Sequence, residues 1–421
     1  MHTQETIITW ATPVFFALIA LELLVARRRG RHAYAASDAI NSIGLGVISQ
    51  IVGVFSTLLT FGIYAWCVQH LALFALPADS VWVWALALLG YDFCYYWLHR
   101  GGHRVNILWA AHVVHHQSER YNLSTALRQT GSGVLLGWLF YLPLAVLGVP
   151  LQVFVVVALI DLLYQFWVHT EQINRLGWFD RVFCSPSNHR AHHAVNDRYL
   201  DHNYGGILIL WDRLFGTFVE EDDADRPVYG TRSPLRSWNP LWANAEVYWN
   251  TARESWRTRR WRDKLLLWVK PPGWQPAELA ARYPRPDFVM PAERFEPPLA
   301  RAMMIYVLAQ FGLQLVMVTQ FLALAGSAQL PTLLGYAAYL VTSLWLLGGL
   351  LESRRWAKWL EGLRVLLTGL VPLASGRWFG ISRLDGQMAM AIGMVFALSA
   401  MALLWASRRP ALSAGQVAVA R

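Results

Sequence analysis

Long apolar segments recur along most of the chain. A helix needs about 20 apolar residues to cross the roughly 30 Å hydrocarbon layer of a bilayer. Runs of that kind, with few charges, lie at 6–26, 43–66, 81–98, 133–149, 151–168, 302–325, 331–350 and 387–407. This pattern predicts an all-α fold, a multi-pass integral membrane helical bundle.

Two neighbouring runs leave the number of spans open. Segments 133–149 and 151–168 are short for complete spans, and Gly148 and Pro150 form a hinge where they meet. They could form two spans or one re-entrant hairpin. A further run, 360–375, contains Arg364 and Pro372 and fits either a span or an amphipathic helix.

The first run predicts the orientation of the bundle. It is followed by Arg27, Arg28, Arg29 and Arg31, whereas a cleaved signal peptide carries its positive charge before the apolar region. By the positive-inside rule, the C-terminal end of this run faces the cytosol. Counting spans from there places every histidine-rich segment on the cytosolic side. The short loops fit a bacterial inner membrane.

Composition supports the membrane class and excludes others. Hydrophobic residues make up 55% of the 421 residues and charged residues only 15%. The net charge of +9 comes mostly from basic residues beside apolar runs, where topology and anionic lipid explain them, so no nucleic-acid partner is expected. The three cysteines form no CxxC pair, which argues against a disulfide framework or a thiolate metal site.

The pattern divides the chain into four predicted parts. These are N-terminal transmembrane helices (1–80), a histidine-rich catalytic core (81–219), a cytosolic or interfacial helical cap (220–300) and C-terminal transmembrane helices (301–421). In the cap, Trp242, Trp249 and Trp256 recur at heptad spacing among arginines. This spacing fits an interfacial amphipathic helix, and equally a helix packed on the core of the cap.

Nine of the thirteen histidines fall into four short segments. They are His99 and His103 (HRGGH), His112, His115 and His116 (HVVHH), His169 (FWVHTE), and His189, His192 and His193 (HRAHH). On a helix, residues three and four apart share a face, so each HxxHH segment would present three imidazoles together. Ser185 as N-cap and Pro186 at the first helical position predict that HRAHH is helical. We interpret His2, His32, His70 and His202 as ordinary polar residues.

Imidazole clusters of this size point to metal. Nine ligands exceed what one tetrahedral or octahedral ion can hold, so two metal ions are expected. Iron, zinc, copper and nickel all accept imidazole, and the sequence does not choose among them.

Three acidic residues lie near the histidines. Asp92 and Asp161 stand on polar stripes of apolar helices, where they could orient ligand imidazoles or close local hydrogen-bond networks. Glu171, beside His169, could serve as the base of a metal-assisted hydrolysis. Oxidation of an unactivated C–H bond would instead need a redox metal pair in an apolar pocket, which this setting favours.

The histidine segments also resemble a known family. HRGGH, HVVHH and HRAHH, in this order, resemble the three histidine boxes of the fatty acid hydroxylase and sterol desaturase superfamily, which are membrane-bound di-iron oxygenases. YDFCYYWLHRGGHRVNILWAAHVVHHQSERYNLSTALRQ at 91–129, FCSPSNHRAHH and NYGGILILWDRLFGTF are similar, within it, to the alkylglycerol monooxygenases. The resemblance is dense from Asp92 to Phe218 and weaker over most of the remaining chain.

This resemblance implies a mechanism and a set of cofactors. Two iron ions held by the nine histidines would use O2 to hydroxylate a lipid carbon, next to an ether oxygen in alkylglycerol monooxygenases, with electrons from tetrahydrobiopterin. Arg104 stands where animal members carry an acidic residue, so a separate electron donor is the alternative to a pterin.

The same residue pattern also fits other functions. A lipid desaturase would use the same scaffold. A histidine-based zinc or copper transporter, or a lipid-binding scaffold without activity, would need the same helices but not the same chemistry.

Overall fold

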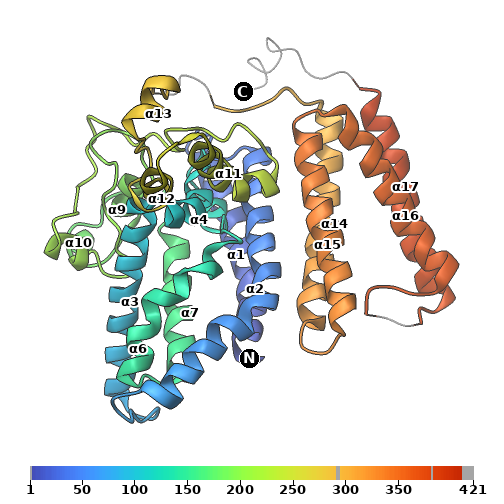
Figure 1. Cartoon of the computed structure of the whole chain (residues 1–421). Coiled ribbons are helices and arrows are strands. Elements are labelled where there is room, and N and C mark those ends of the chain that lie inside the picture. The colour runs from blue at the N-terminus through green and yellow to red at the C-terminus, as the bar shows by residue number, and fades with distance from the viewer. Residues whose placement is uncertain (1, 291–293, 381–382, 410–421) are drawn as a thin grey trace. The chain divides into compact units, whose positions relative to one another are not determined.

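The computed structural model describes residues 2–290, 294–380 and 383–409, with side chains from Thr12 onward except at position 58. Helices form nearly all of its regular structure, and within these residues pairing between extended segments is limited to isolated bridges such as Phe183–Leu208 and Ala194–Tyr229. The predicted all-α fold is confirmed (Figure 1).

The helices follow the apolar runs closely. In chain order they are α1 (His2–Arg28), α2 (Ala36–Leu71), α3 (Val81–Arg104), α4 (Asn106–His116), α5 (Leu123–Ala126), the 3-10 turns η1 (Gly133–Leu135) and η2 (Gly137–Tyr141), α6 (Leu142–Leu147), α7 (Leu151–Trp167), α8 (Phe179–Val182), α9 (Pro186–His192), α10 (Leu210–Leu214), α11 (Pro240–Arg257), α12 (Trp261–Val269), α13 (Ala277–Arg282), α14 (Arg301–Leu324), α15 (Leu330–Leu351), α16 (Arg355–Ser375) and α17 (Gly386–Ser407).

By compactness the chain divides into two units. The first contains residues 1–235 and 243–294, and the second contains 236–242 and 295–421. The division into four functional parts stays a prediction.

Five helices in the described part of the chain are long and apolar enough to cross a membrane. They are Ala36–Thr57 of α2, then α3, α14, α15 and α17. The predicted runs at 81–98, 331–350 and 387–407 lie inside α3, α15 and α17, and the run at 302–325 matches α14 to within one residue. The multi-pass prediction is therefore confirmed, whereas the predicted run at 6–26 lies in α1, whose side chains are described only from Thr12.

The run at 133–149 is not one helix. It is divided into η1, η2 and the short α6, and α7 after it has only 17 residues. At 1.5 Å per residue, α7 is about 26 Å long, less than the hydrocarbon layer. The short lengths favour the hairpin over two complete spans.

Gly148 makes the turn of this hairpin. Its φ is +91°, and a Cβ there would lie 1.9 Å from the carbonyl oxygen of Phe74. Only glycine has the space and the backbone freedom for this position. Pro150 then precedes α7 with a φ of −60° and begins the next helix without strain.

Aromatic packing joins the helices of the first unit. Tyr91 of α3 stacks on Tyr141 with ring centroids 4.5 Å apart, and Tyr64 of α2 stacks on Phe154 of α7 at 4.0 Å. In Figure 1, α3, α6 and α7 run alongside one another, and α4, α9, α11 and α12 gather beyond one end of them. The histidine segments lie at that end.

We predict that Gly148→Ala destabilises the protein strongly, because its Cβ cannot avoid the Phe74 carbonyl. The thermal midpoint in detergent, followed by size-exclusion chromatography after heating, should fall by several degrees or the folded peak should disappear. The matched control is Gly62→Ala in α2, where nothing lies within 4 Å of the added Cβ. Equal midpoints for both variants would contradict this account of the turn.

Candidate metal centre

Helix ends bring the nine histidines to one place. His99 and His103 occupy the last turns of α3, HVVHH ends α4, and His169 lies two residues beyond α7. HRAHH is α9 with His193 as its C-cap. The side chain of Ser185 accepts a hydrogen bond from the amide of Asn188, and Pro186 opens the helix, as the sequence predicts.

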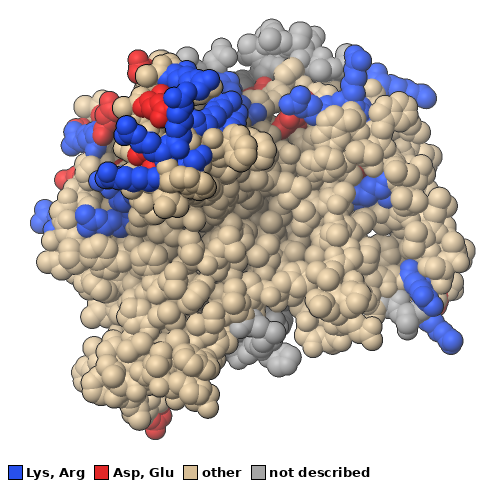
Figure 2. Space-filling view, in the orientation of Figure 1, with Lys and Arg blue, Asp and Glu red and all other residues tan. Residues whose placement is uncertain are grey.

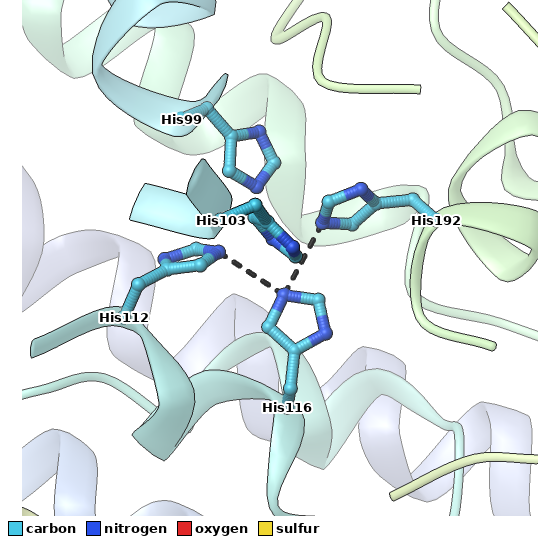
Figure 3. Close-up of side chains that lie close together, drawn as sticks. All are labelled: His99, His103, His112, His116 and His192. Atoms are coloured by element: carbon cyan, nitrogen blue, oxygen red, sulfur yellow. Dashed lines mark hydrogen bonds between the residues drawn. The ribbon is translucent and has the colours of Figure 1, made fainter. Parts of the chain in front are cut away.

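The imidazoles form two separate groups. The five-histidine group contains His99, His103, His112, His116 and His192. The four-histidine group contains His115, His169, His189 and His193. Within each group, one ring nitrogen of every histidine lies within 4.8 Å of the others. Figure 3 shows the rings of the five-histidine group converging on a common space from α3, α4 and α9.

Each HxxHH segment is shared between the two groups, which corrects the sequence expectation that its three imidazoles act together. In α4, His112 and His116 join the five-histidine group and His115 joins the other. Successive residues of a helix point about 100° apart, so His115 and His116 cannot aim at one point. In α9 the division is reversed, because His192 alone joins the five-histidine group. Two short helices therefore serve both groups.

The distances between ring nitrogens fit metal coordination. The Nε2 atoms of His112 and His116 lie 3.0 Å apart, and those of His116 and His192 3.2 Å. In the four-histidine group the corresponding distances are 3.1, 3.1 and 3.2 Å. Two nitrogens at about 2.1 Å from one ion and at right angles are about 3.0 Å apart, against about 3.4 Å for a tetrahedral angle. The arrangement fits ions with five or six ligands better than tetrahedral ones.

Four of the outer ring nitrogens are held by backbone carbonyls. A neutral imidazole that donates from Nδ1 keeps its lone pair on Nε2, ready for a metal. The pairs are His99 with Tyr204 (2.8 Å), His115 with Arg128 (3.0 Å), His169 with Gln165 (2.7 Å) and His192 with His202 (2.9 Å). The inward Nε2 atoms of His99 and His103 are buried without a hydrogen-bond partner among the described residues. A metal ion would satisfy both.

Burial keeps the histidines neutral. It lowers the pKa of every cluster histidine on α4, on α9 and after α7, because water no longer stabilises the charged ring, and in most of them neighbouring imidazoles lower it further. For His115 the pKa falls to about 4. Neutral imidazole is the form that binds metal, so these rings are ready to coordinate at neutral pH.

Asp201 is a residue that sequence reasoning missed. Its carboxylate lies 3.5 Å from Nδ1 of His103 and 3.2 Å from the guanidinium of Arg104. Burial favours the neutral carboxyl, but His103 and Arg104 outweigh it and lower the pKa of Asp201. It thus supplies a negative charge behind one histidine of the five-histidine group.

The segment 201–204 contacts three histidines of the five-histidine group on the side away from its centre. Asp201 faces His103, and the carbonyls of His202 and Tyr204 accept from His192 and His99. Both Asp201 and Asn203 have a φ of +60°, a left-handed conformation that short polar residues tolerate best. The side chain of His202 lies outside both groups, so its role is carried by the backbone.

Arg128 supports the second histidine segment and was also missed. It is 1% exposed and donates to the carbonyl of Val114 in α4 at 2.7 Å and to the side chain of Asn41 at 2.8 Å. Its own carbonyl accepts from His115. A buried cation after α4 thus holds both the helix and one of its imidazoles.

The structure gives the predicted carboxylates other partners. Asp92 accepts from the amides of Ile207 (2.6 Å) and Leu208 (3.1 Å) and from the indole of Trp211 (2.9 Å), so it anchors a loop. This is the local network that the sequence left as the alternative to orienting an imidazole. Asp161 accepts from the side chain of Gln165 at 2.5 Å and reaches His169 only through that residue.

Glu171 likewise lies outside the two groups. Its carboxylate accepts from the hydroxyl of Tyr229 at 3.1 Å. Tyr229 stacks on Tyr121, which in turn stacks on His169. Glu171 therefore contacts the aromatic support of His169 rather than a position where a metal would sit.

Comparison with known proteins identifies the family. The fatty acid hydroxylase family model matches residues 84–217, a segment that contains all nine histidines. The chain is 39% identical to the human alkylglycerol monooxygenase over 85% of its length and 80% of that protein, and 38% identical to the zebrafish (Danio rerio) enzyme over 86% and 81%. The chain belongs to the alkylglycerol monooxygenase family.

A bacterial relative is similar over the catalytic segment only. The ornithine lipid hydroxylase OlsE of Rhizobium tropici is 33% identical over 32% of this chain and 40% of its own length. No solved structure matches the chain. Membership of the alkylglycerol monooxygenase family confirms the resemblance seen in the sequence and makes the chain a monooxygenase-type oxidoreductase.

We predict that Asp201→Asn weakens metal binding at the five-histidine group by about 10- to 100-fold, the usual effect of removing an outer partner of a ligand histidine. Asparagine tolerates the left-handed backbone, so the change isolates the charge. The effect is measured as the amount of metal that stays bound to the protein after incubation with chelators of increasing affinity. Asp222→Asn, at an exposed ion pair with Arg198, is the matched control. If both variants retain the same amount of metal, Asp201 does not strengthen metal binding.

The metal-free protein should lose stability on acidification. The folded pKa of His115 is about 4, below the ordinary value of about 6.5, so the unfolded chain binds more protons between these values. Stability should therefore fall as the pH drops from about 6.5 towards 4, measured as the thermal midpoint of chelator-treated protein. The slope should be smaller in His115→Gln. An unchanged midpoint over this window would contradict the buried, neutral state.

Proposed function

We propose that the chain is a membrane-bound non-haem di-iron monooxygenase that uses O2 to hydroxylate a C–H bond of a lipid. An ether lipid is the first candidate substrate, with fatty acyl and sterol lipids next. The observation that carries the proposal is the pair of all-histidine groups in a chain that shares 39% identity with an alkylglycerol monooxygenase.

The ligand chemistry favours iron. Structural zinc sites hold four ligands, and catalytic zinc sites hold three with one open position, whereas one group here offers five imidazoles. The near right-angle spacing of the nitrogens also suits a higher coordination number than tetrahedral. When bound, a pair of iron ions would supply the redox chemistry that activates O2 toward an unreactive C–H bond.

The residues of the chain would prepare that chemistry in three ways. The buried imidazoles present lone pairs without charge, so they leave the positive charge of the ions uncompensated. The backbone carbonyls fix the ring orientations. Seven of the nine side chains are buried and His112 and His115 are half-buried, which limits water around the site. All nine histidines are the proposed metal ligands.

The position of the site suits a lipid substrate. His99 and His103 lie in the last turns of α3, one of the helices long enough to span a membrane. A lipid whose chains remain in the bilayer could therefore bring a carbon near its headgroup to the metal pair. This placement also disfavours a metal transporter, whose sites usually lie near the middle of the membrane.

The cytosolic side is supported by the arginines after α1. Arg29 donates to the carbonyl of Gln172 at 2.6 Å and Arg31 to that of Glu171 at 2.7 Å, directly after His169. The basic end of α1 and the metal groups thus lie on the same side of the membrane, which the positive-inside rule assigns to the cytosol. A bacterial inner membrane stays a prediction.

The electron donor stays open between a tetrahydropterin and a separate redox partner. Arg104, where the family resemblance led us to expect an acidic residue, is paired here with Asp201. A desaturase on the same scaffold is the second candidate function, because removing a second hydrogen needs the same metal pair. The products distinguish the two.

The first experiment is the metal content of the full chain purified in detergent from iron-replete cells. We expect about two irons per chain, and about one in His192→Ala or in His115→Ala, each of which damages one group. His70→Ala, at an exposed site in α2, is the control and should keep both. Zinc or copper in place of iron, or full iron in both cluster variants, would refute the di-iron assignment.

Activity is tested on the same preparations. With labelled O2 and a chemical reductant, the protein should place one labelled oxygen atom in an alkylglycerol. The two cluster variants lose a ligand itself, so their rates should fall by more than the roughly 10- to 100-fold that follows removal of an outer partner of a ligand. An unsaturated product without labelled oxygen would favour the desaturase.

A further inference from the structure

Helix α12 directs its apolar stripe outward. Trp261, Leu265 and Val269 recur every four residues and are 78%, 67% and 55% exposed, whereas Leu267 on the opposite face is 2% exposed. An apolar stripe of this kind normally faces a core. Its exposure indicates a surface that meets something other than water.

Helix α11 shows the same arrangement. Trp249 is 60% exposed and Trp256, one heptad later, is 86% exposed, while Trp242 is half-buried. A helix packed on the core of the cap would bury these rings. The structure therefore favours the interfacial interpretation of the tryptophan repeat for its last two members.

Both helices lie at the level where α3 ends. Asn106, two residues after α3, donates from its side chain to Thr251 of α11 and to the carbonyl of Leu267 of α12, both at 2.9 Å. The amide of Asn106 donates to the carbonyl of Lys270 at 3.1 Å. Figure 1 views α11 and α12 nearly along their axes while α3 runs up the page, so the two helices lie across the direction of the span.

Seven basic residues lie among or directly after the exposed tryptophans in the sequence. They are Arg253, Arg257, Arg259, Arg260, Arg262, Lys264 and Lys270. In the part of the chain that the structure describes, only Arg259 among them pairs with a carboxylate, that of Glu278 at 3.4 Å. Figure 2 shows Lys and Arg side chains gathered at this end of the first unit. The surface thus offers positive charge that the protein itself does not neutralise.

We propose that the outward faces of α11 and α12 form an interfacial surface that binds anionic phospholipid headgroups of the bilayer that α3 spans. Tryptophan prefers the boundary between headgroups and acyl chains, and long basic side chains reach from it to phosphates. Exposed tryptophans with unpaired arginines, at the end of a span, match this layer in polarity, charge and depth. Because Asn106 begins α4, the same contacts fix the depth of HVVHH relative to the lipid surface.

The test places a fluorophore on the surface. The three native cysteines are buried, so a cysteine introduced by Trp256→Cys can be labelled selectively in the full chain. In nanodiscs containing phosphatidylglycerol, we expect the emission of the label to shift to the blue. Lipids brominated near the headgroup end of the acyl chain should quench about half of the emission intensity. Asp223→Cys, in an exposed acidic turn, is the matched control and should show neither effect.

The charge component is tested separately. In nanodiscs of phosphatidylcholine alone, the quenching of the Trp256→Cys label should decrease at least about twofold. A variant that also combines Arg257→Gln, Arg260→Gln and Arg262→Gln should show the same quenching in both lipids. A label that is unshifted and unquenched in both lipids would overturn the proposal. Protection in native membranes but not in nanodiscs would also overturn it, in favour of a protein partner. None of these readouts depends on the metal or on activity.

Discussion

The enclosure of nine imidazoles in one place is the constraint on which the rest of the first unit depends. Each ring needs a partner for its outer nitrogen, since a buried polar group without one is costly. Backbone carbonyls of Gln165, Arg128, His202 and Tyr204 meet this need for four of them. Arg128, His202 and Tyr204 lie in loops and Gln165 lies in the last turn of α7. These segments cannot move without turning the rings, so the backbone there sets the orientation of the imidazoles.

Buried carboxylates hold the loop that carries two of these carbonyls. Asp92 accepts from the amides of Ile207 and Leu208, and Asp212 accepts from the amides of Tyr204 (2.8 Å) and Gly205 (2.7 Å). Amides that a strand would pair are satisfied here by side chains, which lets an irregular segment pack against α3. The acidic residues Asp92 and Asp212 thus hold the backbone of this loop and do not contact the histidine side chains directly.

Helix length sets the depth of the site. At 1.5 Å per residue the 24 residues of α3 extend about 36 Å, longer than the hydrocarbon layer, so its last two turns can carry His99 and His103 to the edge of this layer or beyond it. The shorter α7 ends at Trp167, and His169 follows in a turn at the same level. Helices of different length therefore deliver their histidines to one layer, where α11 and α12 lie across the end of α3.

Local pattern alone determined much of this protein. Apolar runs predict the helices because each residue in a bilayer must satisfy its backbone hydrogen bonds within its own segment. Spacing predicts the histidine-bearing helices, and Ser185 and Pro186 predict the start of α9, because these signals act within one or two turns.

The tertiary structure alone decided the rest. Three features depend on contacts between distant segments. His115 and His116 face different groups, and Asp201 lies behind His103. Asp92 accepts hydrogen bonds from amides 115 residues or more away. The exposure of Trp249 and Trp256 belongs here too, because a heptad fits a core and an interface equally well. Periodicity reports which residues share a face, and only packing decides what that face meets.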